Sequence, residues 1–116
     1  MIVSGMAKGI DACAGTVCMN ENGYTIAILG NGLDICCPSE HQFLMNKIRE
    51  KGLLLSEYPP GTKPTRYNFP RRNRLISAWA DEVIIIAPGK GSGSLITADY
   101  ASKYGRKVEM MLLESV

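Results

Sequence analysis

A stretch of glycines and hydroxyl side chains near the carboxyl end has the residue types of a phosphate-binding turn. It covers residues 89–97, follows an apolar segment, and contains Ser92, Gly93, Ser94 and Thr97. Glycines let the backbone approach a ligand closely, and the free amides at a helix start attract anions. We therefore predict a phosphate site here. The stretch matches neither the Walker P-loop nor the GxGxxG dinucleotide fingerprint, so a tight connection without a ligand is the alternative.

Basic side chains are concentrated in a second stretch, residues 63–74. It contains no acidic residue, and its five cations are Lys63, Arg66, Arg71, Arg72 and Arg74. The whole chain has a net charge of only +2, so the remainder is net negative. A single basic patch on such a chain indicates a local anion-binding site. The alternative is that these arginines are ordinary solvated surface residues.

Residues suited to catalysis occur in the sequence, but their spacing specifies no catalytic arrangement. Glu57 follows a short apolar segment and is the most plausible lone carboxylate. His41 has no obvious nucleophile partner, and we expect it to be an exposed helix residue. Asp11 and Asp34 follow glycine-rich turns, where they serve either as acid–base groups or as helix caps. We predict no catalytic residue.

The four cysteines do not have the spacing of a metal site. Cys36 and Cys37 are adjacent, Cys13 and Cys18 lie five residues apart, and no CxxC pair exists. The only histidine lies near none of them in a zinc-type spacing. We predict buried, reduced thiols, with no metal and no cofactor.

Apolar residues, glycines and helix caps predict alternating strands and helices. Helices are expected over residues 10–22, from 39 to a stop at Gly52, over 73–80 and over 94–104. Strands are expected at residues 2–3, 25–29, 53–56, 83–87 and 108–113. This alternation is typical of an α/β fold with a mostly parallel sheet and helices on both faces. Because residues 83–87 show no polar alternation, we predict a strand that is covered on both faces.

The first two helices and the turns carry more detailed expectations. The first helix would face the core with Ile10, Ala14, Val17 and Cys18. The second would face inward with Leu44 and Ile48, and Ser39 and Gln42 would form its capping box. Ligands of an open parallel sheet bind beyond the carboxyl ends of the strands. The glycine-rich turns at residues 4–9, 30–32 and 89–94 are therefore expected at one edge.

The size and composition fit one globular domain. The chain has 116 residues, of which 46% are hydrophobic, and this is enough for a packed core. No run of eighteen apolar residues is present, so we predict no membrane span. The first residues have neither the basic start nor the apolar stretch of a signal peptide. We therefore expect a cytoplasmic protein.

Five segments of the sequence resemble the motifs of a known family and occur in the same order. They are SGMAKGID (4–11), LGNGLD (29–34), LLSEYPPG (54–61), NFPRRNRLI (68–76) and SGSLITA (92–98). They are spread over nearly the whole chain, from residue 4 to residue 98. In this order they closely resemble the motifs of the DprA/Smf family of DNA-processing proteins.

The resemblance implies a three-layer Rossmann-like fold, with a sheet of about five strands, that binds single-stranded DNA without catalysis. It further implies a homo-oligomer, and a protein that protects incoming DNA in natural transformation and helps to load the RecA recombinase. By motif match, the DNA pocket would involve Ser4, Gly5, Lys8, Gly9, Phe69, Arg71, Asn73, Arg74, Ser92, Gly93, Ser94 and Thr97.

The sequence also departs from the family pattern. Gly15 stands where the family usually has a histidine, Ala87 where many members have a glutamate, and residues 112–114 where Pro-Gly is usual. Residues 1–116 would form a partial domain, a fragment or a truncated gene product, without the family's first strand and helix or any preceding helical domain. That strand would lie between the strands at residues 2–3 and 83–87. We predict that these two strands pair directly, or that another chain completes the sheet, because unpaired edges in a core are costly.

Two other functions are compatible with a Rossmann-like chain. Related phosphoribohydrolases cleave nucleoside monophosphates and resemble PGGxGTxxE at the glycine turn, whereas residues 91–98 read GSGSLITA and lack the following glutamate. This difference favours binding over cleavage. The third possibility, a nucleotide-sensing domain, is left open by the sequence.

Overall fold

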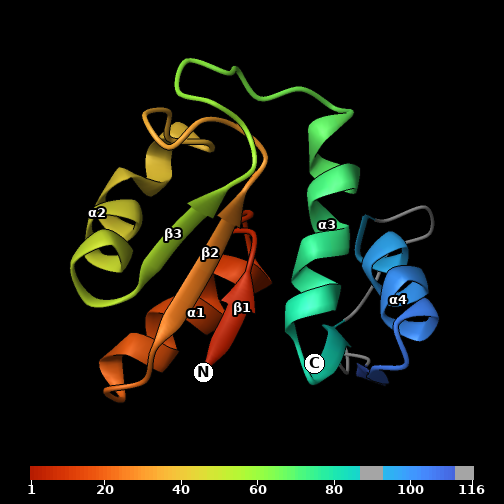
Figure 1. Cartoon of the computed structure of the whole chain (residues 1–116). Coiled ribbons are helices and arrows are strands. Elements are labelled where there is room, and N and C mark those ends of the chain that lie inside the picture. The colour runs from red at the N-terminus through yellow and green to blue at the C-terminus, as the bar shows by residue number, and fades with distance from the viewer. Residues whose placement is uncertain (87–92, 112–116) are drawn as a thin grey trace.

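The computed structural model describes residues 1–86 and 93–111, without the side chains of residues 93 and 94 (Figure 1). Strands and helices alternate along the chain. In order they are β1 (Ile2–Ser4), α1 (Ile10–Asn20), β2 (Thr25–Leu29), a 3-10 helix (Ser39–His41), α2 (Gln42–Lys51), β3 (Leu53–Ser56), α3 (Asn68–Trp79), β4 (Glu82–Ile86), α4 (Gly93–Lys103) and β5 (Lys107–Met111). The predicted α/β order is confirmed. None of the helices in the described ranges is long and apolar enough to cross a membrane.

All strand pairs are parallel, but they form two sheets. One has the order β1-β2-β3, and the other pairs β4 with β5. The predicted direct pairing of β1 with β4 is therefore wrong. Helix α3 packs against β1 and β2 and also against α4, so it contacts both regions of the molecule (Figure 1). Within the described ranges β1 pairs only with β2, and β4 only with β5.

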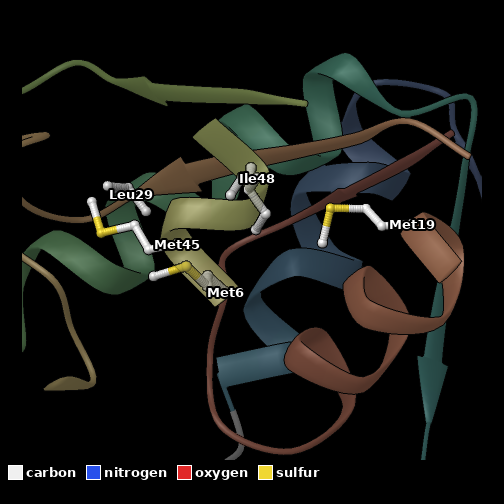
Figure 2. Packing of buried hydrophobic residues seen from close by; sticks show 6 residues of the cluster. Met6, Met19, Leu29, Met45 and Ile48 are labelled. Carbon is white, nitrogen blue, oxygen red and sulfur yellow. The ribbon is translucent and has the colours of Figure 1, made fainter. Parts of the chain in front are cut away.

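The first core lies between the β1-β2-β3 sheet and helices α1 and α2. Ala27 and Leu29 alternate along β2 and meet three methionines and an isoleucine: Met6, Met19, Met45 and Ile48 (Figure 2). Period-two alternation places the intervening Ile28 on the opposite face. There it lines a hollow with Leu75 and Trp79 of α3. Helices therefore cover both faces of this sheet, as predicted.

The buried face of α1 differs from the expected one. Gly15 and Met19 are its buried residues, whereas Ile10 is 43% exposed and Val17 is 55% exposed. Gly15 lets the helix approach β2 closely, since the Thr25 hydroxyl donates a hydrogen bond to the Gly15 carbonyl at 3.4 Å. Glycine has no apolar side chain, so the hydrophobic pattern of the helix does not mark the face that contains Gly15. The predicted inward face of α1 is therefore wrong.

The start of α2 lacks the predicted capping box. Ser39 begins the short 3-10 helix instead, and the Gln42 side chain donates a hydrogen bond to Asn46. The rest of the α2 prediction is confirmed: Ile48 is buried, Leu44 packs against the core, and Gly52 ends the helix. A side chain at Gly52 would place its Cβ 2.2 Å from the carbonyl oxygen of Thr25.

Helix α3 starts five residues earlier than expected, at Asn68 rather than at residue 73. Pro70 suggested a loop, but it lies in the first turn of the helix. Amides of the first turn have no partner within the helix, so proline is tolerated there. The earlier start places the whole of NFPRRNR on one rigid element.

The second core lies between α4 and the β4-β5 sheet. It consists of Val83, Ile85, Ala98 and Ala101. Ile84, between the two buried strand residues, is 50% exposed, so the prediction of a doubly covered strand is wrong. Helix α4 packs against both strands, and on the opposite side Ile84 meets no comparable cover among the described residues.

Candidate functional site

A buried arginine joins α3 to the carboxyl ends of β1 and β2. Arg72 is only 4% exposed, and its Nη1 donates hydrogen bonds to the carbonyls of Gly5 at 3.1 Å and Ile28 at 2.6 Å. Its Nε donates to the Asn73 side chain at 3.1 Å. Burial lowers the pKa of the Arg72 guanidinium, and the nearby Asp11 carboxylate opposes this shift. Arginine stays protonated in proteins, so a fixed positive charge lies beneath this edge.

Two glycines make room for this arginine and for the ring of Phe69. A Cβ on Gly5 would lie 2.5 Å from the guanidinium carbon of Arg72, and one on Gly30 would lie 2.8 Å from the Phe69 ring. The guanidinium carbon lies 5.5 Å from the ring centroid of Phe69. The close backbone approach that we predicted for a ligand at Gly5 is thus taken by a side chain of the protein itself.

Asp11 and Asp34 hold loops in place. The Gly5 amide donates to Oδ2 of Asp11 at 3.0 Å, and the Gly61 amide donates to Oδ1 of Asp34 at 2.8 Å. The buried Asn31 donates to the Gly32 and Ile35 carbonyls, which fixes the turn after β2. The predicted helix-cap role is wrong for both aspartates, because their carboxylates accept hydrogen bonds from loop amides and not from amides at a helix start.

The cations of the predicted site differ in how they are engaged. Arg71 is exposed, as are Lys63 and Arg66 in the preceding loop. Lys8 forms an ion pair with Glu40 at 3.2 Å, and its side chain is 75% exposed. Arg74 forms an ion pair with Glu57, and both of these side chains are mostly covered. Exposed pairs contribute little free energy, so Lys8 can exchange Glu40 for a phosphate more readily than Arg74 can exchange Glu57.

Three further predicted residues lie at the end of β1, directly before α1 and within α4. Ser4 is buried, and its hydroxyl accepts a hydrogen bond from the Met6 amide at 3.4 Å. Gly9 precedes α1 with a φ of 88°, a conformation that favours glycine. Thr97 is buried, and its carbonyl accepts a hydrogen bond from Ser77 of α3 at 2.7 Å.

Part of the predicted phosphate turn lies outside the described residues. Ser92 is among those omitted, while Gly93 and Ser94 begin α4, which packs against α3. Asn73 lies one turn before Ser77 and therefore belongs to the α3 face that meets α4. The structure thus gathers Gly5, Phe69 and Asn73 around Arg72. The predicted contact between Arg71, Arg74 and the turn at Ser92 stays a prediction.

His41 and the cysteines differ partly from expectation. His41 is half-buried, with Nδ1 3.0 Å from the Met6 carbonyl, rather than an exposed helix residue. All four cysteines are free, but Cys13 is exposed and the other three are half-buried, so the prediction of buried thiols was too general. Burial raises the pKa of the Cys36 thiol, and the neighbouring Cys37 adds to this shift. Within residues 1–86 and 93–111, no group of metal-ligating side chains is assembled.

The sequence prediction missed the central role of Arg72. We treated it as one of several surface arginines, because charged residues in a proline-containing segment are usually solvated. A usable signal was the pair of glycines at the ends of β1 and β2, which leaves space for a large side chain. The spacing of Phe69 and Arg72 by three residues also places both on one face of a helix.

Known proteins are similar to this chain in sequence and in fold. The sequence profile of the DNA recombination-mediator protein A family matches residues 1–114. The chain belongs to this family. This confirms the resemblance to DprA/Smf proteins. Protein Smf of a Synechocystis species is 50% identical over 107 residues, which are 92% of this chain and 27% of that protein.

Two solved structures of DprA match the fold of the chain. DprA from Streptococcus pneumoniae has a TM-score of 0.89 at 39% identity and covers the whole chain, which in turn covers 41% of that protein. DprA from Helicobacter pylori, whose structure is described for its single-stranded DNA binding mode, has a TM-score of 0.88 at 34% identity, and 52% of it is covered. The predicted Rossmann-like fold is confirmed. The chain spans about a quarter to a half of the relatives that it matches.

Proposed function

We propose that this chain is the single-stranded-DNA-binding part of a DNA-processing protein of the DprA/Smf type. The observation that carries the proposal is the position of α3. Its first turns bring Arg71, Arg72 and Arg74 to the carboxyl edge of the β1-β2-β3 sheet. Residues 58–80 contain no acidic residue to oppose these cations. The DNA binding described for the Helicobacter pylori relative supports this proposal.

A single strand fits this edge chemically. Phosphates would meet the exposed Arg71 and Lys8, together with the hydroxyls and amides at the start of α4. The buried charge of Arg72 adds to the positive potential without contacting the ligand. Phe69, half-buried at the edge, would offer the exposed part of its ring to a base. None of these groups reads base edges in a groove, so we expect little sequence preference.

The main test is the double substitution Arg71→Ala with Arg74→Ala. We expect weaker binding of labelled oligo-dT in fluorescence anisotropy, by a similar factor for other unstructured sequences. The salt dependence of log K should flatten by roughly 0.7 per lost phosphate contact. The control is Lys51→Ala with Lys103→Ala, which removes two exposed cations from other helices. Unchanged affinity and slope in the arginine variant would disprove the site.

The ion pair between Arg74 and Glu57 allows a second test, in which the substitution should strengthen DNA binding and not weaken it. Glu57→Gln removes the acidic group that neutralises Arg74 while preserving its size. We expect binding of oligo-dT to tighten severalfold at low salt, with a steeper salt slope, because one more cation is available to phosphate. Weaker binding in this variant would contradict a role for Arg74 in contacting DNA.

We propose binding without catalysis. Incubation of the pure protein with nucleoside monophosphates should release no free base, measured by chromatography over hours. Glu57, the carboxylate that we singled out, forms its ion pair with Arg74 rather than standing alone. Steady turnover that is lost in Glu57→Gln would replace the binding proposal with that of a phosphoribohydrolase-like enzyme.

The wider role is also a proposal. It includes protection of incoming DNA in natural transformation, help in loading RecA, assembly with a second copy of the chain, and a cytoplasmic location. Sedimentation of the protein with and without oligo-dT and purified RecA measures both assemblies directly. A monomer that never co-sediments with RecA would restrict the role of this chain to DNA binding.

A further inference from the structure

Tyr67 is an exposed aromatic residue at the start of the basic helix. It lies directly before α3, at the end of the loop from β3, and is 70% exposed. Arg66 provides its described contacts: the guanidinium carbon lies 5.1 Å from the ring centroid, and Nη2 donates to the phenol oxygen at 3.0 Å. Most of the ring surface therefore faces solvent.

Phe69, two residues later, is held very differently. Its ring lies against Gly30 at the end of β2 and beside the buried guanidinium of Arg72. These contacts hold Phe69 at the sheet edge and leave only part of its ring accessible. Of the two aromatic residues, Tyr67 has the larger accessible surface for a flat partner.

The charges around Tyr67 indicate what kind of partner would cover it. Lys63, Arg66 and Arg71 are exposed cations in the neighbouring sequence, and residues 58–80 carry no acidic group. An aromatic ring among cations suits a ligand that combines phosphates with exposed flat bases. In a duplex the bases stack on each other, so an unpaired strand fits this surface better.

We propose that Tyr67 stacks on a base of single-stranded DNA and extends the binding site by one nucleotide beyond Phe69, along the β3–α3 loop. This inference rests on the proposed function. The Cα atoms of residues two apart are separated by at most about 7 Å, a reach comparable to the spacing of neighbouring nucleotides. Both rings therefore lie within reach of one short unpaired strand.

The test separates base stacking from charge. Tyr67→Ala and Tyr67→Phe are compared for binding to oligo-dT and to an abasic oligonucleotide of the same length and charge. We expect Tyr67→Ala to weaken oligo-dT binding about tenfold and to leave binding of the abasic strand unchanged. The salt slope should also stay the same, because no phosphate contact is lost. Tyr67→Phe keeps the ring and should bind like the parent chain.

Tyr24→Ala is the matched control. Tyr24 is another exposed tyrosine, 45% exposed, and it lies before β2 at the opposite edge of the sheet. Its substitution should not change binding. Equal losses of Tyr67→Ala on both oligonucleotides, or no loss on oligo-dT, would overturn the stacking role while leaving the proposed function intact. If the parent chain itself failed to bind oligo-dT, the proposed function and this inference would both be wrong.

Discussion

The sheet formed by β1, β2 and β3 and the sheet formed by β4 and β5 bury their residues differently. In β2, Ala27 and Leu29 face α1 and α2, and Ile28 faces α3; all three are at most 2% exposed. In β4, Val83 and Ile85 are buried under α4, whereas Ile84 is 50% exposed. Both strands are mainly apolar. An apolar strand sequence therefore permits burial of both faces, but it does not show that both faces are buried.

Helix α3 connects the two regions with different kinds of contacts. Toward the first sheet it inserts Arg72, which binds two strand carbonyls. Toward the second region it uses Ser77, whose hydroxyl donates to Thr97, and the carbonyl of Ala78, which accepts from Arg106. The first region is thus joined to α3 by a buried charge, and the second by one buried neutral hydrogen bond and one part-buried hydrogen bond from a guanidinium. Because the outer face of β4 is half exposed at Ile84, we expect the second region to open more easily.

The largest effect is expected from Arg72→Met, which breaks the connection to the first sheet. The variant keeps a long side chain but leaves the Gly5 and Ile28 carbonyls without this donor. We expect the free energy of unfolding in urea to fall by about 2–6 kcal/mol, since two buried carbonyls lose their donor and each unsatisfied group costs about 1–3 kcal/mol. Arg71→Met, at an exposed neighbouring position, should change it by less than about 0.5 kcal/mol. Equal effects would show that Arg72 is not the connecting residue.

The next prediction compares one isoleucine from each region. Ile48 is 1% exposed in the first core, and Ile84 is half exposed on β4. We expect Ile48→Ala to lower the free energy of unfolding by about 2–4 kcal/mol, in the range of buried truncations. Ile84→Ala should cost less than about 1 kcal/mol, because much of its surface already meets water. A large loss at Ile84 would reveal a cover supplied by a second copy of the chain.

A third prediction concerns the edges of β1 and β4 that pair with no strand among the described residues. We propose that a further strand belongs between them, as the partial-domain interpretation implies. In the present chain, amides of β4 and β5 should exchange with deuterium at least about tenfold faster than those of β2 and β3. An extended chain that supplies one more strand should slow exchange in β1 and β4 and raise stability in urea. Unchanged exchange would mean that the two sheets are independent of such a strand.

The smallest effect is expected from Tyr58→Phe at the end of β3. The Tyr58 hydroxyl is buried and has no hydrogen-bond partner among the described residues. Its removal should change stability at neutral pH by less than about 0.5 kcal/mol, or raise it slightly.

The same variant has a pH dependence of known sign. Burial, and then the Glu57 carboxylate, raise the pKa of Tyr58 above its ordinary value. The contribution of the phenol is therefore fully present below its unfolded pKa of about 10 and is lost as the pH rises through the folded pKa. Tyr58→Phe should reduce this alkaline loss in urea unfolding above pH 10. An unchanged alkaline loss would show that Tyr58 is not its source.

Much of the fold could be predicted from the sequence because glycines and apolar runs mark its elements. Strands at residues 25–29 and 53–56 match β2 and β3 residue for residue, and Gly52 ends α2 as expected. The predictions of helix faces and helix starts failed at two positions where a residue that is uncommon in helices fits the structure. Gly15 forms a buried helix face, and Pro70 lies in the first turn of α3. Hydrophobic periodicity depends only on the polarity of side chains, so it predicts neither the buried glycine nor the proline in the helix.

The candidate site was predicted only in outline. Its expected position at the carboxyl edge followed from the α/β order. Arg72 and Arg74 of α3 lie at that edge, and the role of this edge in DNA binding stays a prediction. Which arginine is exposed could not be predicted, because Arg71, Arg72 and Arg74 are chemically alike and differ only in their angle around α3. Once the helix is placed, Arg72 points beneath the sheet edge, Arg74 meets Glu57, and Arg71 faces solvent.

The close fit of Gly5 against Arg72 constrains how these positions can change over time. As long as the guanidinium fills the space beside residue 5, even alanine would place a methyl group within 2.6 Å of its nitrogens. A lineage that lost the arginine would at once be free to accept small side chains at position 5. It could then not regain the arginine without reverting to glycine. Glycine at position 5 and arginine at position 72 should therefore be conserved together. Loss of the arginine followed by a larger residue at position 5 should be hard to reverse.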